Sequence, residues 1–300
     1  MNVINYAERF QTELDQAIVQ NTLTNALETP NVNWMGARTF HVPHLEVSGY
    51  KNHSRAGGFN RGTVETTHDP YTLQFDRDVE FFVDSMDVDE SNQAASAANV
   101  TREFITRHAG PEIDAYRFSK MATKAIELNQ ATEEEIDADN VIQALKRDIA
   151  KVRKYGTANL VCYVSSEVMN AIELYKEGKG SFSLQNEGTA IETRVTMLDG
   201  VRLIEVFDVD RFYTEFDFTE GFVPASGAKE LNWIIVNKGT IIAKAKHNAI
   251  FLFQPGQHTQ GDGYLYQNRL YHDLFVLKYQ QDGLVVSVKN GGGGGGGVEG

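Results

Sequence analysis

Between residues 91 and 128 the hydrophobic positions fall on one face of a long helix. Spacings of mostly three to five residues, the period of a helix face, separate Ile105, Ala109, Ile113, Tyr116, Met121 and Ala125. About 38 residues of helix would span ~57 Å at 1.5 Å per residue. Sustained heptads are missing, so the pattern favours a rod that carries other layers over a coiled-coil arm. Pro111 lacks an N–H and clashes with the carbonyl four residues back, which predicts a kink or break at residues 108–110.

Residues 36–84 alternate hydrophobic and polar positions and predict one long β-hairpin. The phase slips at Pro43, which predicts either a bulge or a strand edge without a neighbour. Residues 50–63 between the two arms are polar and glycine-rich, as in a mobile loop. Each arm of about 12 residues spans ~40 Å. Because a two-stranded ribbon is marginal alone in water, we expect this one to lie on another surface, such as a second subunit.

Residues 1–30 have the pattern of one or two amphipathic helices that Pro30 ends. Two interpretations are open: an ordinary helix on the core, and an arm that reaches a neighbouring subunit.

After residue 128, helices alternate with strands, which predicts a mixed α+β domain around a central sheet. A linker is expected at residues 132–136, and Asp139 is expected to cap the next helix. The further elements expected are a helix from 141 to about 152, a strand at 158–164, a helix from 165 or 166 to 175, a loop at 178–190, strands 191–198 and 201–207 around the turn Asp199–Gly200, a short helix at 208–213, strand 231–237 meeting strand 240–245, and further strands within 247–290.

Composition narrows the function classes. The chain has 300 residues, 41% of them hydrophobic, which is enough for a sizeable core. Its net charge of −13 argues against binding nucleic acid through phosphate neutralisation, although it suits a container that must not grip its contents. No apolar run approaches the ~20 residues of a membrane span, and the N-terminus lacks the pattern of a secretory signal. Cys162 is the single cysteine and lies in an apolar run, so we expect a buried thiol rather than a nucleophile.

The sequence contains no motif that predicts a catalytic residue, a metal site or a cofactor. His41 and His44 would point to opposite faces of a strand, which does not suit a shared metal ion. The glycine-containing stretch 55–62 lacks the Gly-Lys-Ser/Thr of a phosphate-binding loop. Acid and base groups that meet only in space escape such a search, so a soluble α+β enzyme stays as one alternative.

The stretch from Pro111 to Ala122, with the alanines at 94–98 and Arg102-Glu103-Phe104 before it, resembles the spine-helix region of tailed-bacteriophage major capsid proteins. The likeness is to capsid proteins with the Hong Kong 97-like fold from phages of Gram-positive hosts, and the order of segments agrees over about residues 5–290. This resemblance implies an α+β fold with an N-terminal arm (1–35), an extended β-hairpin loop (36–84), a peripheral domain with a long kinked spine helix (85–140 and 246–282), a mixed axial domain (141–245 and 283–290) and a flexible glycine-rich tail (291–300).

By the same resemblance, the function would be that of a major capsid protein of the virion, made in the cytoplasm of a bacterial host. It would assemble through hexamers and pentamers into an icosahedral shell around double-stranded DNA, without specific DNA binding, a cofactor or a membrane. The chain starts directly at the arm, so a separate scaffolding protein or prior cleavage is expected. A portal and a decoration protein are further expected partners. An encapsulin-like compartment, which has the same fold, is the alternative.

Assembly is then the expected mechanism, and the expected contacts lie in three places. Subunits would meet through the arm, the hairpin tip and one face of the hairpin, at Tyr6, Phe10, Leu14, Arg55, Arg61, Tyr71, Phe75, Val79 and Phe81. Some members of the family join a loop lysine to an asparagine of another subunit, and Lys51 is the only lysine in this loop.

Overall fold

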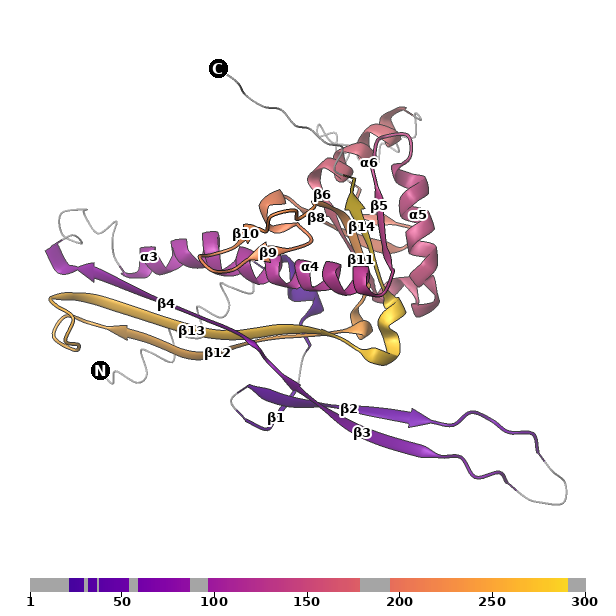
Figure 1. Ribbon diagram of the computed structural model, residues 1–300, viewed down its shortest axis with the longest axis horizontal. Helices are drawn as coiled ribbons and strands as arrows, with labels where there is room; N and C mark the ends of the chain where they lie inside the picture. The colour runs from indigo at the N-terminus through magenta and orange to yellow at the C-terminus, as the bar shows by residue number, and fades with distance from the viewer. Residues whose placement is uncertain are drawn as a thin grey trace, which may run out of the picture.

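The computed structural model describes residues 22–29, 32–36, 38–53, 59–86, 97–178 and 195–290. Two β-sheets and a long spine helix form the body, and one β-hairpin projects from it (Figure 1). The short segment η1 (Leu23–Leu27) attaches the described N-terminal part to the spine helix. There the backbone N–H groups of Leu23 and Thr24 donate to the buried carboxylate of Asp114, both at 2.9 Å. Burial raises the pKa of Asp114.

A six-stranded mixed sheet has the strand order β5-β14-β11-β6-β8-β7. Its central strands β6 and β11 are buried along their whole length, which explains their unbroken apolar sequences. The strands of this sheet are β5 (Ala131–Glu134), β6 (Leu160–Ser165), β7 (Met197–Leu198), β8 (Val201–Val206), β11 (Leu231–Asn237) and β14 (Leu284–Lys289). Asp199 and Gly200 both have positive φ in the tight turn between β7 and β8, as their sequence predicts.

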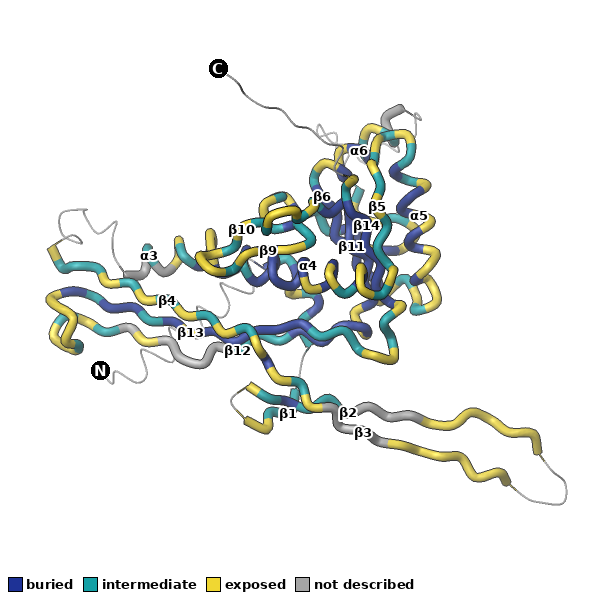
Figure 2. Tube along the Cα trace, viewed as in Figure 1, coloured by how far each residue is buried: buried dark blue, intermediate teal, exposed yellow. Residues whose placement is uncertain are grey.

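Each face of this sheet has its own hydrophobic core. Helices α5 (Val141–Val152) and α6 (Ser166–Gly178) cover one face, where Cys162 and Trp233 are fully buried. The spine helix covers the other face with Phe118 and Met121. Figure 2 shows this sheet as the most buried part of the chain.

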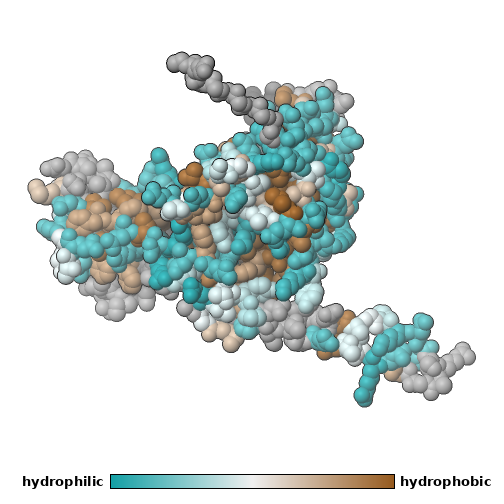
Figure 3. All heavy atoms as spheres, viewed as in Figure 1, coloured by the Kyte–Doolittle hydropathy of each residue, from teal (hydrophilic) through white to brown (hydrophobic). Residues whose placement is uncertain are grey.

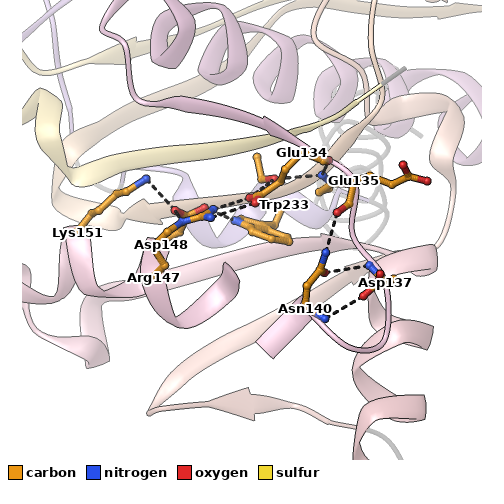
Figure 4. A network of polar contacts seen from close by, with 10 residues as sticks. Glu134, Glu135, Asp137, Asn140, Arg147, Asp148, Lys151 and Trp233 are labelled. Atoms are coloured by element: carbon orange, nitrogen blue, oxygen red, sulfur yellow. Dashed lines mark hydrogen bonds and ion pairs between the residues drawn. The ribbon is translucent and has the colours of Figure 1, made fainter. Parts of the chain in front are cut away.

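A polar network fixes α5 on the sheet (Figure 4). The buried Asp148 carboxylate accepts from the indole N–H of Trp233 at 3.1 Å and lies 2.8 Å from the Lys151 ammonium. Arg147 binds the carboxylate of Glu134 on β5 through two nitrogens. A buried carboxylate is tolerated only with such partners, so the network specifies where α5 lies.

The spine consists of α3 (Ala97–Phe104), a π-helical turn (Ile105–Ala109) and α4 (Gly110–Glu127). In the π-turn the Gly110 N–H donates to the Ile105 carbonyl five residues back. The kink or break predicted at residues 108–110 is corrected, because the structure has a π-turn over residues 105–109 and the helix continues through it. All six positions of the predicted apolar stripe, from Ile105 to Ala125, are buried.

The second sheet lies along the spine helix and has the antiparallel order β12-β13-β4. It contains β12 (Ile241–Phe253), β13 (Gly263–Val276) and β4 (Phe75–Asp84). Tyr266 and Leu270 of β13 pack with Ile105 and Ile113 of the spine. This packing buries most of β13 inside the body (Figure 2).

The projecting hairpin consists of β2 (Thr39–Val47) and β3 (Val64–Thr72), with the two-residue strand β1 (Asn33–Trp34) beside β2. The predicted extent of 36–84 is wrong at its end, because β4 leaves the hairpin and pairs with β13. The alternation continues through the two-residue link between β3 and β4, so the sequence does not reveal the change of partner. Pro43 pairs in register without a bulge, on a strand that has no neighbour on its other side there.

Three smaller expectations are corrected. The expected linker at 132–136 begins as strand β5, which pairs in parallel with β14. Asn140 rather than Asp139 precedes α5, and the Asp137 carboxylate accepts the N–H groups of both. Strand β12 does not pair with β11 but leaves for the second sheet, so residues 241–245 belong to that sheet and not to the six-stranded one. The remaining described elements are the short pair β9 (Phe216–Asp217) and β10 (Val223–Pro224) and five 3-10 turns: η3 (Arg153–Tyr155), η4 (Thr157–Asn159), η5 (Val209–Arg211), η6 (Lys238–Thr240) and η7 (Lys278–Gly283).

Candidate subunit-contact surfaces

An aromatic cluster joins the base of the projecting hairpin to the body. Phe40 of β2 is fully buried, with ring centroids 5.4 Å from Trp34 and 6.3 Å from Phe275 of β13. The Lys246 ammonium lies 4.2 Å from the Trp34 ring centroid in a cation–π contact. The base of the hairpin is therefore anchored by packing, whereas its outer part extends away from the body (Figure 1).

The outer part of the hairpin exposes large hydrophobic side chains. Tyr50 and Phe59 near the tip are essentially fully exposed, and Val47 and Val64 at the strand ends are 61% and 67% exposed. Few bonds hold the flanks of the loop together: Ser48 and Thr63 exchange backbone and side-chain hydrogen bonds, and the Asn60 amide donates to the Asn52 carbonyl. Exposed aromatic side chains on an isolated ribbon are typical of a surface that another molecule covers.

A groove of about 770 Å³ lies at the root of the hairpin, between α4 and the end of β13. Hydrophobic surface gathers in this region on the face shown in Figure 3. Aromatic side chains dominate its walls, and Lys120, Lys124 and Lys278 lie at its margin. Its aromatic residues are Tyr71, Tyr116, Phe216, Phe218, Phe275 and Tyr279. Such an open apolar groove beside a projecting ribbon offers a second surface for contacts between subunits.

Two of the residues predicted for subunit contacts lie in different parts of the hairpin. Arg61 is exposed at the hairpin, and its carbonyl accepts from the Lys51 ammonium at 3.2 Å. Tyr71 lies in the wall of the groove. The other predicted tip and arm residues, Arg55, Tyr6, Phe10 and Leu14, lie outside the described residues.

Phe75, Val79 and Phe81 are corrected, because they lie on β4 and not on the hairpin. Their half-buried side chains face the spine helix of their own chain. Phe75 stacks on Tyr116 with ring centroids 4.2 Å apart, and Phe81 meets Phe104 at 5.3 Å. The period-2 pattern located a buried strand face correctly, but it could not show which element buries it.

The sequence prediction omitted Tyr50 and Phe59 from the contact surface. Both are large hydrophobic residues in a stretch that is otherwise polar and rich in glycine, and that contrast is the signal that could have identified them.

An ion pair between Arg77 and Glu112 joins β4 to the spine helix. The Arg77 guanidinium lies 2.6 Å from Glu112 of α4 and donates to the carbonyls of Phe218 and Gly221. Burial raises the pKa of Glu112, and the charge of Arg77 opposes that rise. These contacts hold β4 against the spine helix and against the segment that contains Phe218 and Gly221.

The described residues contain no cluster of three or more histidine, cysteine or acidic side chains that could hold a metal ion. The Cys162 thiol is fully buried, and burial raises its pKa, so it is a poor nucleophile. No helix in the described part of the chain combines the length and the hydrophobicity needed to cross a lipid bilayer.

Comparison with known proteins places the fold. No family model and no curated protein sequence matches the chain. Among solved structures, a chain of the mature capsid of bacteriophage PhiM1 matches with a TM-score of 0.58 and 12% identity, over 85% of this chain and 82% of that one. The capsid protein of cyanophage P-SCSP1u matches with a TM-score of 0.57 and 10% identity, over 88% and 86%. The virus-like particle from Pyrococcus furiosus matches with a TM-score of 0.51 and 10% identity, over 94% and 99%.

These matches span most of each chain, and they confirm the expected α+β capsid fold of the Hong Kong 97-like type. Because the sequences are only 10–12% identical, the similarity to these proteins is limited to the fold.

Proposed function

We propose that this protein is the major capsid protein of a tailed bacteriophage, a subunit that assembles through hexamers and pentamers into an icosahedral shell around double-stranded DNA. The observation that carries the proposal is the projecting hairpin on a capsid fold. Among the described residues, its strands pair with each other and, at the base, with β1, and the described side chains of its outer part are exposed. A shell, in which every subunit has neighbours, provides the covering surface that the hairpin lacks here.

In this proposal the hairpin of one subunit lies on the body of the next, and Tyr50 and Phe59 are its hydrophobic anchors. Each contact can be weak, because a subunit engages several neighbours at once and the effects of simultaneous contacts multiply. The six-stranded sheet with α5 and α6 would gather around the five- and six-fold axes. The second sheet and the spine would connect neighbouring capsomers. The segment containing Tyr6, Phe10 and Leu14 would add a further contact.

The charge of the chain permits DNA as the content of the shell. Its 41 acidic and 28 basic residues give a net charge that disfavours tight binding of DNA phosphates to the wall. We propose that DNA is enclosed without specific binding, that scaffolding and portal proteins act as assembly partners, and that a decoration protein binds the finished shell. The host cytoplasm is the proposed site of synthesis.

Expression of the full chain followed by negative-stain electron microscopy tests this proposal. We expect closed shells or capsomers, with a scaffolding protein co-expressed if the chain alone stops at capsomers. A stable monomer under both conditions, with no tendency to associate, would contradict it.

A compartment for a protein cargo is the second candidate, favoured by the match to the Pyrococcus furiosus virus-like particle over nearly the whole of both chains. Shells purified from the natural source distinguish the two candidates by their content. The phage proposal expects DNA, and genes for a portal and a terminase nearby. The alternative expects an enclosed enzyme, and a peroxidase or ferritin-like gene nearby.

A further inference from the structure

The projecting hairpin continues into the body at the short link Leu73–Gln74, between β3 and β4. Leu73 is fully buried, and its N–H donates to the Arg38 carbonyl at 2.9 Å. The Gln74 side chain is exposed, but its backbone N–H points into the body and donates to the carboxylate of Asp273 at 3.1 Å. The ribbon is therefore joined to the body at a link where the Gln74 N–H is bonded to the buried carboxylate of Asp273.

Asp273 lies on β13 and is 1% exposed. One carboxylate oxygen accepts from the Tyr116 hydroxyl of the spine at 2.9 Å and from the Leu274 N–H at 2.8 Å. The other oxygen accepts from Gln74. Hydrogen bonds to an ionised acceptor are shorter and stronger than neutral ones, so this side chain joins three elements: spine, sheet and hairpin link.

Two of these three bonds lie within the body and would hold Asp273 in place without the hairpin. The third bond serves only the link. Hydrophobic packing at the hairpin base, around Phe40 and Phe275, is non-directional and tolerates small rotations. A hydrogen bond weakens steeply as its angle departs from linearity, so the strength of the bond to Gln74 depends on the direction of the ribbon.

Direction matters because the ribbon is long. Nine residues of β3 span about 30 Å at 3.3 Å per residue, so a rotation of about 10° at the link displaces the strand end by about 5 Å. A displacement of that size exceeds what packed contacts accommodate.

We propose that Asp273 is the positioning residue that sets the direction of the hairpin, and thereby determines where its tip meets a neighbouring subunit. The first half concerns the single chain. The second half rests on the proposed function.

Two substitutions separate the bonds of this carboxylate. In Asp273→Asn the amide oxygen can still accept from Tyr116 and Leu274, which leaves the NH2 group facing the Gln74 N–H, two donors without an acceptor. Tyr116→Phe removes only the bond to the spine and leaves the link bond intact. Asp148→Asn is a matched control, since it neutralises an equally buried carboxylate that lies on α5, away from the hairpin. Asp273→Glu keeps the charge but moves it, and replaces the amide variant if that variant does not fold.

Single-molecule energy transfer measures the direction in free subunits, at concentrations too low for assembly. Dyes are placed on Lys51→Cys at the hairpin and Asn170→Cys on α6, both exposed positions, while the buried Cys162 stays unlabelled. We expect one narrow distance distribution for the parent, for Tyr116→Phe and for Asp148→Asn. We expect loss of that single distribution, by shift or broadening, for Asp273→Asn, and a shift for Asp273→Glu. Thermal unfolding confirms that each variant is folded.

The outcomes separate the two halves of the proposal. An unchanged distance in Asp273→Asn overturns the positioning role, whatever the protein assembles into. A changed distance with shells of normal size and yield overturns the link between direction and assembly. If the parent stays a monomer both alone and with a scaffolding protein, the proposed function fails while the distances still decide the role of Asp273.

Discussion

The protein contains two long β-hairpins that differ in what covers them. β12–β13, with strands of 13 and 14 residues, lies against the spine helix and has β4 as a third strand. β2–β3, with strands of nine residues, has only the two-residue β1 at its base and extends into solvent. Figure 2 shows buried positions along β13 and exposed ones along the described outer part of β2–β3. The same kind of β-hairpin is thus part of the core in one place and an exposed projection in the other.

The comparison shows that an alternating pattern predicts a strand but not whether that strand is covered by its own chain. A two-stranded ribbon has too little burial to be stable alone, so β12–β13 obtains its stability within the chain, whereas β2–β3 is expected to obtain it from a neighbour. The predictions below test this difference, beginning with the largest expected effect.

Deletion of residues 50–63 with closure by a two-residue turn should abolish closed shells. The body should keep its thermal unfolding transition, because none of the described residues in this stretch belongs to a hydrophobic cluster. Electron microscopy and calorimetry measure the two effects. Tyr50→Ser with Phe59→Ser is the matched variant, since it keeps the loop length and removes only the exposed anchors. Normal shells from the deletion would refute the assigned role of the ribbon.

Truncation of one aromatic residue in each hairpin should show opposite effects. Tyr266→Ala on β13 removes a side chain that is 2% exposed and should lower the free energy of unfolding by about 3–5 kcal/mol. Phe59→Ala near the tip of β2–β3 should change that free energy by less than about 0.5 kcal/mol and weaken assembly instead. Urea denaturation and sedimentation measure the two quantities. Equal destabilisation by both variants would mean that the tip is packed in the isolated subunit.

Sequence reasoning found the strands but not their partners. The alternation that runs to residue 83 correctly predicted a strand at β4, but not that its half-buried face packs on the spine helix of the same chain. Pairing of β4 with β13, which joins Asp84 to Gly263, depends on residues far apart in sequence, and no local pattern carries that information. Leu73 is buried and Gln74 exposed, so the link continues the alternation and conceals the end of the hairpin.

The spine was predictable because its signals are local. The apolar stripe has the helical period, and Pro111 indicates an irregularity, although the structure has a π-turn over residues 105–109 in place of the predicted kink or break. Strand β5 escaped prediction because its Glu133 and Glu134 suit a solvated linker. Glu134 pairs with Arg147 and Glu133 with Lys229, contacts that become visible only in the folded chain.

The smallest expected effect concerns an exposed ion pair between β13 and β4 in the second sheet. Arg269 of β13 lies 2.7 Å from Asp76 of β4, and its hydrogen bond lowers the pKa of Asp76. Because the pair is largely exposed, Asp76→Asn should cost less than about 1 kcal/mol.

The pH dependence of that cost follows from the direction of the shift. A carboxyl whose pKa is lowered by folding stabilises the native state above its unfolded pKa and loses this contribution as the pH falls through its folded pKa. The stability difference between parent and Asp76→Asn, measured by urea denaturation, should therefore be present at neutral pH and vanish in acid. A difference that grows as the pH falls would contradict this assignment.

Hydrogen exchange of the two hairpins, in free subunits and in assembled particles, tests the central claim most directly. The account predicts that backbone amides in the outer half of β2–β3 exchange rapidly in free subunits and become protected in particles. Amides of β13 should be protected in both states. Strong protection of β2–β3 in the free subunit, or rapid exchange that persists after assembly, would contradict the claim that a neighbouring subunit completes this hairpin.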